Sequence, residues 1–87
     1  DAFAFLQRAD AVAFDLIYIA PPQYRQLWEK ALLLVDACPQ LLTAAGQVVV
    51  QIHPKEDRPL TLASLRRFDE RTYGSTLLVF YGHAPQE

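Results

Sequence analysis

Residues 14–24 read Phe-Asp-Leu-Ile-Tyr-Ile-Ala-Pro-Pro-Gln-Tyr, an apolar run that ends abruptly in two prolines. The run over 14–19 is rich in β-branched and aromatic side chains, which predicts a buried strand. Pro21 and Pro22 lack amide hydrogens and hold φ at about −65°, so the strand cannot continue through them. A residue that precedes a proline is also kept out of the helical region. We therefore expect a rigid elbow at the carboxyl end of a strand, where open α/β sheets bind ligands.

Helical and strand patterns alternate through the first half of the chain. Residues 1–8 have a partly apolar, helix-friendly composition. The segment 24–36 has the apolar stripe of a helix that packs on a sheet. Residues 41–46 predict a turn with Gly46 as its hinge. Residues 47–53 are continuous in valine and isoleucine, which predicts a strand covered on both faces. The stripe of the helix consists of Leu27, Trp28, Ala31, Leu32 and Val35, and we expect Trp28 to belong to the core.

The last third of the chain predicts an antiparallel hairpin. Residues 55–59 form a charged loop after Pro54, and 61–67 are expected to make one or two helical turns. The segments 68–73 and 75–81 are β-prone and flank Gly74. The whole pattern is that of an α/β protein whose sheet closes with a hairpin.

Composition limits the classes of protein to which the chain can belong. Its 87 residues are one small domain or a piece of one, and 52% hydrophobic with 21% charged residues excludes disorder. No apolar run approaches about 18 residues, and the N-terminus lacks a signal-peptide pattern. The single Cys38 excludes an intrachain disulfide and fits the cytoplasm, while the few cysteines and histidines argue against a structural zinc site. A net charge of −2 argues against a strong independent grip on nucleic acid.

The string around the two prolines resembles motif IV of S-adenosylmethionine-dependent amino-methyltransferases, [Asp/Asn/Ser]-Pro-Pro-[Tyr/Phe/Trp]. The longer string Ile-Tyr-Ile-Ala-Pro-Pro-Gln-Tyr-Arg-Gln-Leu-Trp, residues 17–28, is similar to the RsmD-type branch, the 16S rRNA guanine-N2 methyltransferases. The strings at 50–56 and 71–81 fit the same family. The resemblance implies that residues 1–87 are the second half of a Rossmann-like class I methyltransferase domain, a single partial domain without the cofactor-binding first half.

The resemblance also implies roles for the residues of the elbow. Pro21 and Pro22 would shape it, and the carbonyls of Ala20 and Pro21 would accept hydrogen bonds from the exocyclic amine of the acceptor. Tyr24 would stack on the flipped base, displaced by one position because Gln23 is inserted. Ala20 stands where the family has a side-chain acceptor, so Gln23 and the backbone would have to replace it, or activity would be slow or lost.

The cofactor residues implied by the resemblance are few. Asp1 and Ala2 match the segment that holds the adenine of S-adenosylmethionine, although Asp1 could equally be a capping residue. The family's glycine-rich loop has no counterpart, because Gly46, Gly74 and Gly82 form no G-x-G cluster. We therefore expect the 87-residue chain to be a fragment that by itself neither binds S-adenosylmethionine tightly nor turns over.

Several other polar residues have both a functional and a structural interpretation. His53, at a strand end, either binds substrate or is satisfied by a backbone carbonyl. Asp15 is expected to cap or pair locally. Arg66, Arg67 and Arg71 either contact rRNA phosphates or form an ordinary solvated hairpin face.

Three functions follow, together with one prediction about assembly. The leading interpretation is methylation of a guanine in small-subunit rRNA or a ribosomal particle. The alternatives are a methyltransferase for DNA or protein amines, which shares the elbow chemistry, and a non-catalytic protein-association module. We also predict that the strand 14–19 is an unpaired apolar edge through which the chain self-associates, because such edges are templates for pairing.

Overall fold

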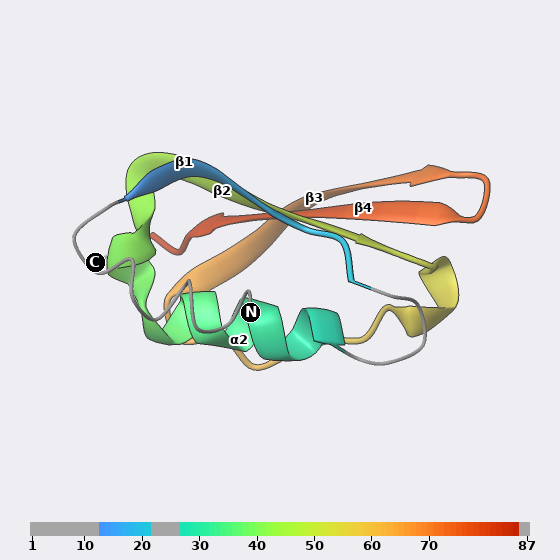
Figure 1. Ribbon diagram of the computed structural model, residues 1–87, viewed down its shortest axis with the longest axis horizontal. Helices are drawn as coiled ribbons and strands as arrows, with labels where there is room; N and C mark the ends of the chain where they lie inside the picture. Colours follow the sequence, from blue (N-terminus) through green and yellow to red (C-terminus); the bar gives the residue numbers. More distant parts are fainter. Residues whose placement is uncertain (1–12, 22–26, 86–87) are drawn as a thin grey trace.

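Four strands form one mixed sheet in the computed structural model, which describes residues 13–21 and 27–85 (Figure 1). The sheet has the order β1-β2-β4-β3, in which β1 and β2 are parallel and the other neighbours are antiparallel. The expectation of an α/β fold is confirmed. The elements in chain order are β1 (Phe14–Ile19), α2 (Leu27–Ala37), η1 (Pro39–Leu41), β2 (Leu42–Ile52), η2 (Pro54–Glu56), β3 (Leu65–Tyr73) and β4 (Thr76–His83).

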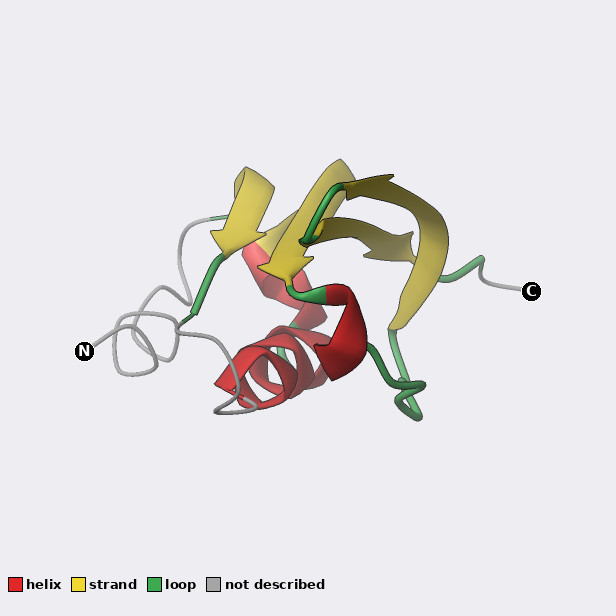
Figure 2. Cartoon of the chain, turned by 90° about the vertical axis from the view of Figure 1, so that its right-hand side faces the viewer, coloured by secondary structure: helices red, strands yellow, loops and turns green. Residues whose placement is uncertain are grey.

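Strand β1 lies at one edge of the described sheet and confirms the strand predicted over 14–19. Its side chains alternate: Ile17 and Ile19 are buried, whereas Leu16 and Tyr18 are exposed. The buried pair faces α2, which lies below the sheet (Figure 2). The predicted helix 24–36 is confirmed from Leu27 onward; residues 24–26, like the helix predicted over 1–8, lie outside the described residues.

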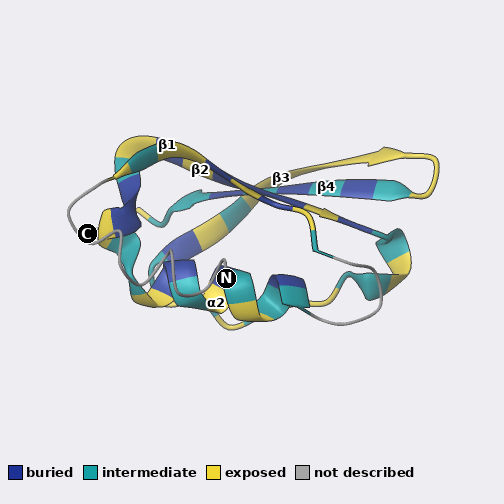
Figure 3. Cartoon of the chain, in the orientation of Figure 1, coloured by how far each residue is buried: buried dark blue, intermediate teal, exposed yellow. Residues whose placement is uncertain are grey.

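The core lies between α2 and the sheet, where buried residues from every described strand meet (Figure 3). Trp28 is almost fully buried there, which confirms it as a core residue. The opposite face of the sheet, called here the outer face, has no helix over it among the described residues. On this face Tyr18 lies opposite Val49 in the strand register, and Val49 lies opposite Phe80. The Phe80 ring packs edge-to-face against Phe68.

The prediction of a turn over 41–46 is wrong, because β2 already begins at Leu42. Leu42 pairs with Phe14, but the next registered pair is Leu16 with Gln47, so β2 bulges between the two pairs. Gly46 lies in this bulge. A Cβ there would come within 2.7 Å of the Leu42 side chain and 3.0 Å of the Phe14 carbonyl oxygen. The glycine therefore permits a close approach inside a strand and does not act as a hinge.

The prediction of helical turns over 61–67 is also wrong. Both oxygens of the Asp36 carboxylate accept hydrogen bonds from the backbone amides of Ala63, Ser64 and Leu65, at 2.7–2.8 Å. These bonds hold the segment against the end of α2, and β3 begins at Leu65. A contact distant in sequence thus overrides the local helix propensity.

The predicted hairpin is confirmed, with β3 longer than expected at its start. Tyr73 pairs with Thr76 across a two-residue turn. Gly74 has φ of 59°, in the left-handed region that glycine enters without steric cost. A register shift between Arg67 and Asp69 marks a bulge in β3.

Candidate functional site

Two parallel strands end side by side, and a proline stops each of them. Ile19, the last residue of β1, pairs with Val50 near the end of β2. Ala20-Pro21 follows β1, and His53-Pro54 follows β2. The carboxyl ends of β1 and β2 therefore lie side by side at the same end of the sheet, toward the right of Figure 1. This carboxyl edge, which is distinct from the lateral edge formed by β1, is the candidate functional site, since the carboxyl edges of open α/β sheets are where ligands bind.

Only the first part of the predicted elbow lies within the described residues. Ala20 is exposed and Pro21 is half-buried. The methyl group of Ala20 offers no hydrogen-bond acceptor, so the backbone carbonyls are the acceptors that these two residues can present. Pro22, Gln23 and Tyr24 lie outside the described residues.

The side chain of His53 is held by the short helix η2. Its Nδ1 accepts a hydrogen bond from the backbone amide of Lys55 at 3.0 Å, and its own backbone amide donates to Glu56 Oε2 at 3.0 Å. The ring is thus engaged as an acceptor of a backbone amide, whereas the structural interpretation expected a backbone carbonyl as its partner. Because Nδ1 is the acceptor, a neutral ring has its proton on Nε2.

The segments that follow the two strand ends are tied together by an ion pair. Arg58, in the loop after η2, places Nε 3.2 Å from Oε1 of Glu29 in the first turn of α2. Next to Glu29, the indole Nε1 of Trp28 is buried without a hydrogen-bond partner among the described residues. The Arg58 side chain is half-exposed, so this ion pair marks a contact between the loop after β2 and α2 and contributes little to stability.

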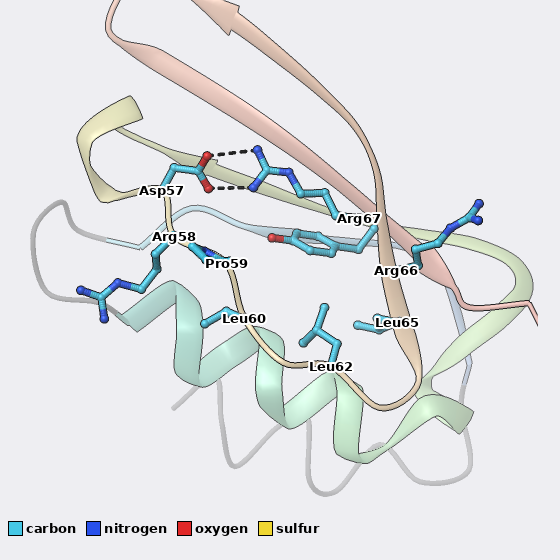
Figure 4. A pocket seen from close by; sticks show the side chains of 9 residues that line it. Asp57, Arg58, Pro59, Leu60, Leu62, Leu65, Arg66 and Arg67 are labelled. Atoms are coloured by element: carbon cyan, nitrogen blue, oxygen red, sulfur yellow. Dashed lines mark hydrogen bonds and ion pairs between the residues drawn. The ribbon is translucent and has the colours of Figure 1, made fainter.

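A pocket of about 500 Å³ lies between the loop after η2 and the strands β3 and β4 (Figure 4). Leucine side chains and Tyr81 line its interior, and the ion pair of Asp57 and Arg67 closes one end. Burial raises the pKa of the Tyr81 hydroxyl. The lining residues are Asp57, Arg58, Pro59, Leu60, Leu62, Leu65, Arg66, Arg67 and Tyr81. Among the described residues of β1 and the elbow, 14–21, none lines this pocket.

Two of the three arginines considered for rRNA contacts have partners within the chain. The guanidinium of Arg67 donates to both oxygens of Asp57, at 2.8 and 3.1 Å, and also pairs with Glu70. These hydrogen bonds raise its pKa above the ordinary value for arginine. Arg71 pairs with Asp69 and lies 5.8 Å from the ring centre of Phe80. Arg66 is exposed on β3.

Two aspartates, Asp15 and Asp36, accept hydrogen bonds from partners far away in the sequence. Oδ1 of Asp15 accepts a hydrogen bond from the Thr43 hydroxyl at 2.8 Å, so its partner lies on the neighbouring strand β2 and is not local in sequence as expected. The role of Asp36 was missed. Burial raises its pKa, but the three backbone hydrogen bonds outweigh burial and leave the pKa below its ordinary value of 3.8. An acid in the last turn of a helix opposes the helix dipole, and this was the available signal that it has a specific partner.

The described residues do not form a glycine-rich loop that could bind S-adenosylmethionine. Gly46 lies in the bulge of β2, Gly74 in the hairpin turn and Gly82 in β4, so none forms a loop between a strand end and a helix. Asp1 and Ala2 lie outside the described residues. Within 13–21 and 27–85, no group of three or more histidine, cysteine and acidic residues could hold a metal ion. No helix in these ranges is long and apolar enough to cross a membrane.

Comparison with known proteins gives one family and several structures. The family described as conserved hypothetical protein 95 matches residues 1–82. The fold is similar to that of the proposed methyltransferase yhhF from Escherichia coli, with 20% identity and a TM-score of 0.72. A proposed methylase from Haemophilus influenzae has 22% identity and a TM-score of 0.75. A conserved hypothetical protein from Streptococcus pyogenes has 23% identity and a TM-score of 0.71.

These similarities extend over nearly the whole chain but only part of each structure. They cover 99%, 98% and 90% of this chain, and 46%, 48% and 50% of the three structures in the same order. The chain thus spans about half the length of the structures that it matches. No curated protein matches it significantly. The shared fold is that of part of a Rossmann-like methyltransferase domain, as the resemblance implied.

Proposed function

This chain belongs to the family described as conserved hypothetical protein 95, and from that premise we propose that it is the acceptor-binding part of a methyltransferase. The proposed reaction moves a methyl group from S-adenosylmethionine to the exocyclic N2 of a guanine in small-subunit rRNA. The S–CH₃ bond breaks as the N–CH₃ bond forms, S-adenosylhomocysteine leaves, and the amine nitrogen gives up one proton to solvent. The observation that carries the proposal is the pair of proline-stopped strand ends, Ala20-Pro21 and His53-Pro54, at one edge of the sheet. The fold shared with two proposed methyltransferases supports it.

The elbow would act by positioning the acceptor amine. Carbonyl oxygens of Ala20 and Pro21 would accept hydrogen bonds from the two N–H groups, which orients the nitrogen lone pair and increases its electron density. Tyr24 would stack on the guanine once that base leaves its helix, offsetting part of the cost of unstacking. His53, held on η2 at the same edge, would contact the substrate. Catalysis of this kind depends on orientation and electrostatics and needs no covalent intermediate.

The residues that would bind the methyl donor are a separate set from those that would bind the acceptor. Asp1 and Ala2 are the proposed contacts to its adenine, and the described residues do not form the remainder of the site. The proposal therefore assigns this chain the acceptor side of the reaction. S-adenosylmethionine, when bound, supplies the methyl group.

The test is a methyl-transfer assay with tritiated S-adenosylmethionine. Protein containing this chain is incubated with naked 16S rRNA, with small ribosomal particles, with duplex DNA and with bulk protein. The 87-residue chain alone is assayed in parallel. We expect label only in RNA or particles, and only from protein that also contains a competent donor site. Digestion to nucleosides should identify the product as N2-methylguanosine. Label in DNA or protein would instead support the alternative acceptors.

The absence of a side-chain hydrogen-bond acceptor at Ala20 favours one second candidate, a non-catalytic association module. That candidate predicts no labelled product on any acceptor even when the protein binds S-adenosylmethionine. A Tyr24→Ala variant separates the cases further. It should lower methylation of RNA by about 10-fold or more if Tyr24 stacks on the base, and it should change nothing measurable in a protein without activity.

A further inference from the structure

The loop between η2 and β3 is held at both ends and borders the pocket of about 500 Å³ (Figure 4). At the start of the loop, the Asp57 carboxylate accepts two hydrogen bonds from the Arg67 guanidinium, at 2.8 and 3.1 Å. At its end, the backbone amide of Ala63 donates to the Asp36 carboxylate at 2.8 Å. Residues 58–62 lie between these two anchors, so the loop is held beside the strands although it does not fill the space next to them.

The leucine side chains of the pocket are not fully covered by the protein. Leu60 and Leu62 pack against the core but are only half-buried, and both line the pocket together with the buried Leu65. Sites for small molecules have volumes of roughly 300–1,000 Å³ and are lined mainly by apolar side chains with a few polar groups. A volume of about 500 Å³ is within this range, and an apolar ligand there would cover the remaining leucine surface.

Tyr81 supplies a polar group to this apolar pocket. Its side chain is 2% exposed and lies opposite Arg67 in the register of β3 and β4. Burial raises the pKa of Tyr81, so the hydroxyl stays neutral and can donate or accept a hydrogen bond. Among the described residues this hydroxyl has no hydrogen-bond partner. Because a buried hydroxyl without a partner costs free energy, a ligand that bonds to it gains specificity as well as affinity.

The charges around the pocket favour a neutral ligand that donates a hydrogen bond. The Arg67 guanidinium lies between the carboxylates of Asp57 and Glu70, so this end of the pocket has one excess negative charge. The guanidinium groups of Arg58 and Arg66 point away from the pocket (Figure 4). An anion would therefore be repelled, and a cation would lose its hydration among the leucines. A neutral N–H or O–H group avoids both costs.

We propose that this pocket binds a small, neutral aromatic compound that carries one N–H or O–H donor. The ring of the ligand lies against Leu60 and Leu62, and its donor faces the hydroxyl oxygen of Tyr81. This site is separate from the elbow, since no described residue over 14–21 lines it. The proposal thus adds a second ligand to the one that the carboxyl edge would bind.

Indole and 1-methylindole are the probes, because their ring systems are the same and only indole has an N–H donor. Protein that contains this chain is labelled with ¹⁵N, titrated with each probe and followed by NMR. We expect indole to bind with a Kd of about 0.01–1 mM and to shift the amide signals of Leu60, Leu62 and Tyr81. One hydrogen bond should make indole bind about 2–10-fold more tightly than 1-methylindole.

Two substitutions test the hydroxyl and the space separately. Tyr81→Phe keeps the ring, so both probes should still bind while the preference for indole disappears. Leu62→Trp should fill the pocket and weaken binding of both probes by about 10-fold or more. Leu33→Trp is the matched control and should bind them normally, since Leu33 is 43% exposed on α2 and does not line the pocket. Circular dichroism establishes which variants fold, and the Tyr81→Phe comparison decides the matter if Leu62→Trp does not.

Three results would overturn the proposal. The first is the absence of any shift with indole up to about 5 mM. The second is a set of shifts confined to residues 14–21 or to the outer face of the sheet, which would place the probe elsewhere. The third is a preference for indole that persists in Tyr81→Phe, because the hydroxyl would then not be its partner. None of these results depends on methyl transfer, so failure here leaves the proposed function untouched.

Discussion

The carboxylate of Asp36, in the last turn of α2, accepts a hydrogen bond from the backbone amide of Leu65, where β3 begins. The distance is 2.8 Å, and the same carboxylate also binds the amides of Ala63 and Ser64. A single buried acid thus fixes the entry of the edge strand β3 relative to the helix. The link is structural, because it joins elements that carry the sheet and lies away from the strand ends at the candidate site.

Replacing Asp36 by asparagine should destabilise the fold. The amide group retains one acceptor oxygen, but its NH₂ group would face one of the three backbone amides as donor against donor. We expect the free energy of unfolding to fall by about 1–3 kcal/mol, measured by urea denaturation. Asp69→Asn is the control, because Asp69 is exposed and its contacts are local. It should change stability by less than about 0.5 kcal/mol. Equal losses in both variants would contradict the role assigned to Asp36.

The same residue makes stability depend on pH in acid. The pKa of Asp36 is lowered in the folded state, so unfolding takes up a proton when the pH is below the ordinary value of 3.8. The contribution of the carboxylate is fully present above that pH and is lost as the pH falls toward the lower, folded-state pKa. The difference in unfolding free energy between the unsubstituted chain and Asp36→Asn should therefore shrink below about pH 4. A difference that stays constant down to about pH 2 would contradict this assignment.

The sequence correctly predicted those elements whose conformation depends on residues within the element itself. Ile17 and Ile19 alternate with exposed neighbours in β1, Trp28 and Leu32 lie on the apolar stripe of α2, and Gly74 has the positive φ of the hairpin turn. Each of these signals lies within one element. The two wrong predictions concern segments whose conformation depends on partners far along the chain.

Residues 42–46 end in a glycine, which favours a turn, yet pairing of Leu42 with Phe14 makes them a bulged strand. Residues 63–65 favour a helix but bind Asp36 instead. At the candidate site, the sequence predicted that Pro21 follows the end of one strand and Pro54 follows the end of the next. It did not predict that the His53 ring accepts a backbone amide, because that depends on the geometry of η2.

Gly46→Ala should destabilise the sheet. The added Cβ would lie 2.7 Å from the side chain of Leu42 and 3.0 Å from the carbonyl oxygen of Phe14, and the latter is backbone that cannot move independently. We expect a loss of about 1–3 kcal/mol in thermal or urea unfolding. In the matched variant Gly82→Ala, the nearest atom would be 3.8 Å from the new Cβ. That substitution should be neutral or stabilise by up to about 1 kcal/mol, and the reverse order of effects would refute the close-approach argument.

Arg67→Lys should lower stability although it keeps the charge. The guanidinium binds both oxygens of Asp57 and pairs with Glu70, and an ammonium cannot reproduce that planar arrangement. The pair is partly exposed, so solvent screening limits the expected loss to about 0.5–1 kcal/mol. Arg66→Lys, on the neighbouring exposed position, should be silent. A double-mutant cycle with Asp57→Asn measures the coupling directly, and a coupling near zero would show that the pair contributes nothing.

Ala20→Asn tests whether the elbow positions the acceptor amine. The substitution restores a side-chain oxygen at the position where related motifs have one, next to the backbone carbonyls that the proposal uses. If the amine binds there, the additional hydrogen bond should raise kcat for RNA methylation by about 10-fold, which corresponds to about 1.4 kcal/mol of transition-state stabilisation. Ala37→Asn, at the exposed end of α2, is the control and should leave the rate unchanged. An Ala20→Asn protein that folds and binds RNA but methylates no faster would mean that the acceptor amine does not lie against this elbow.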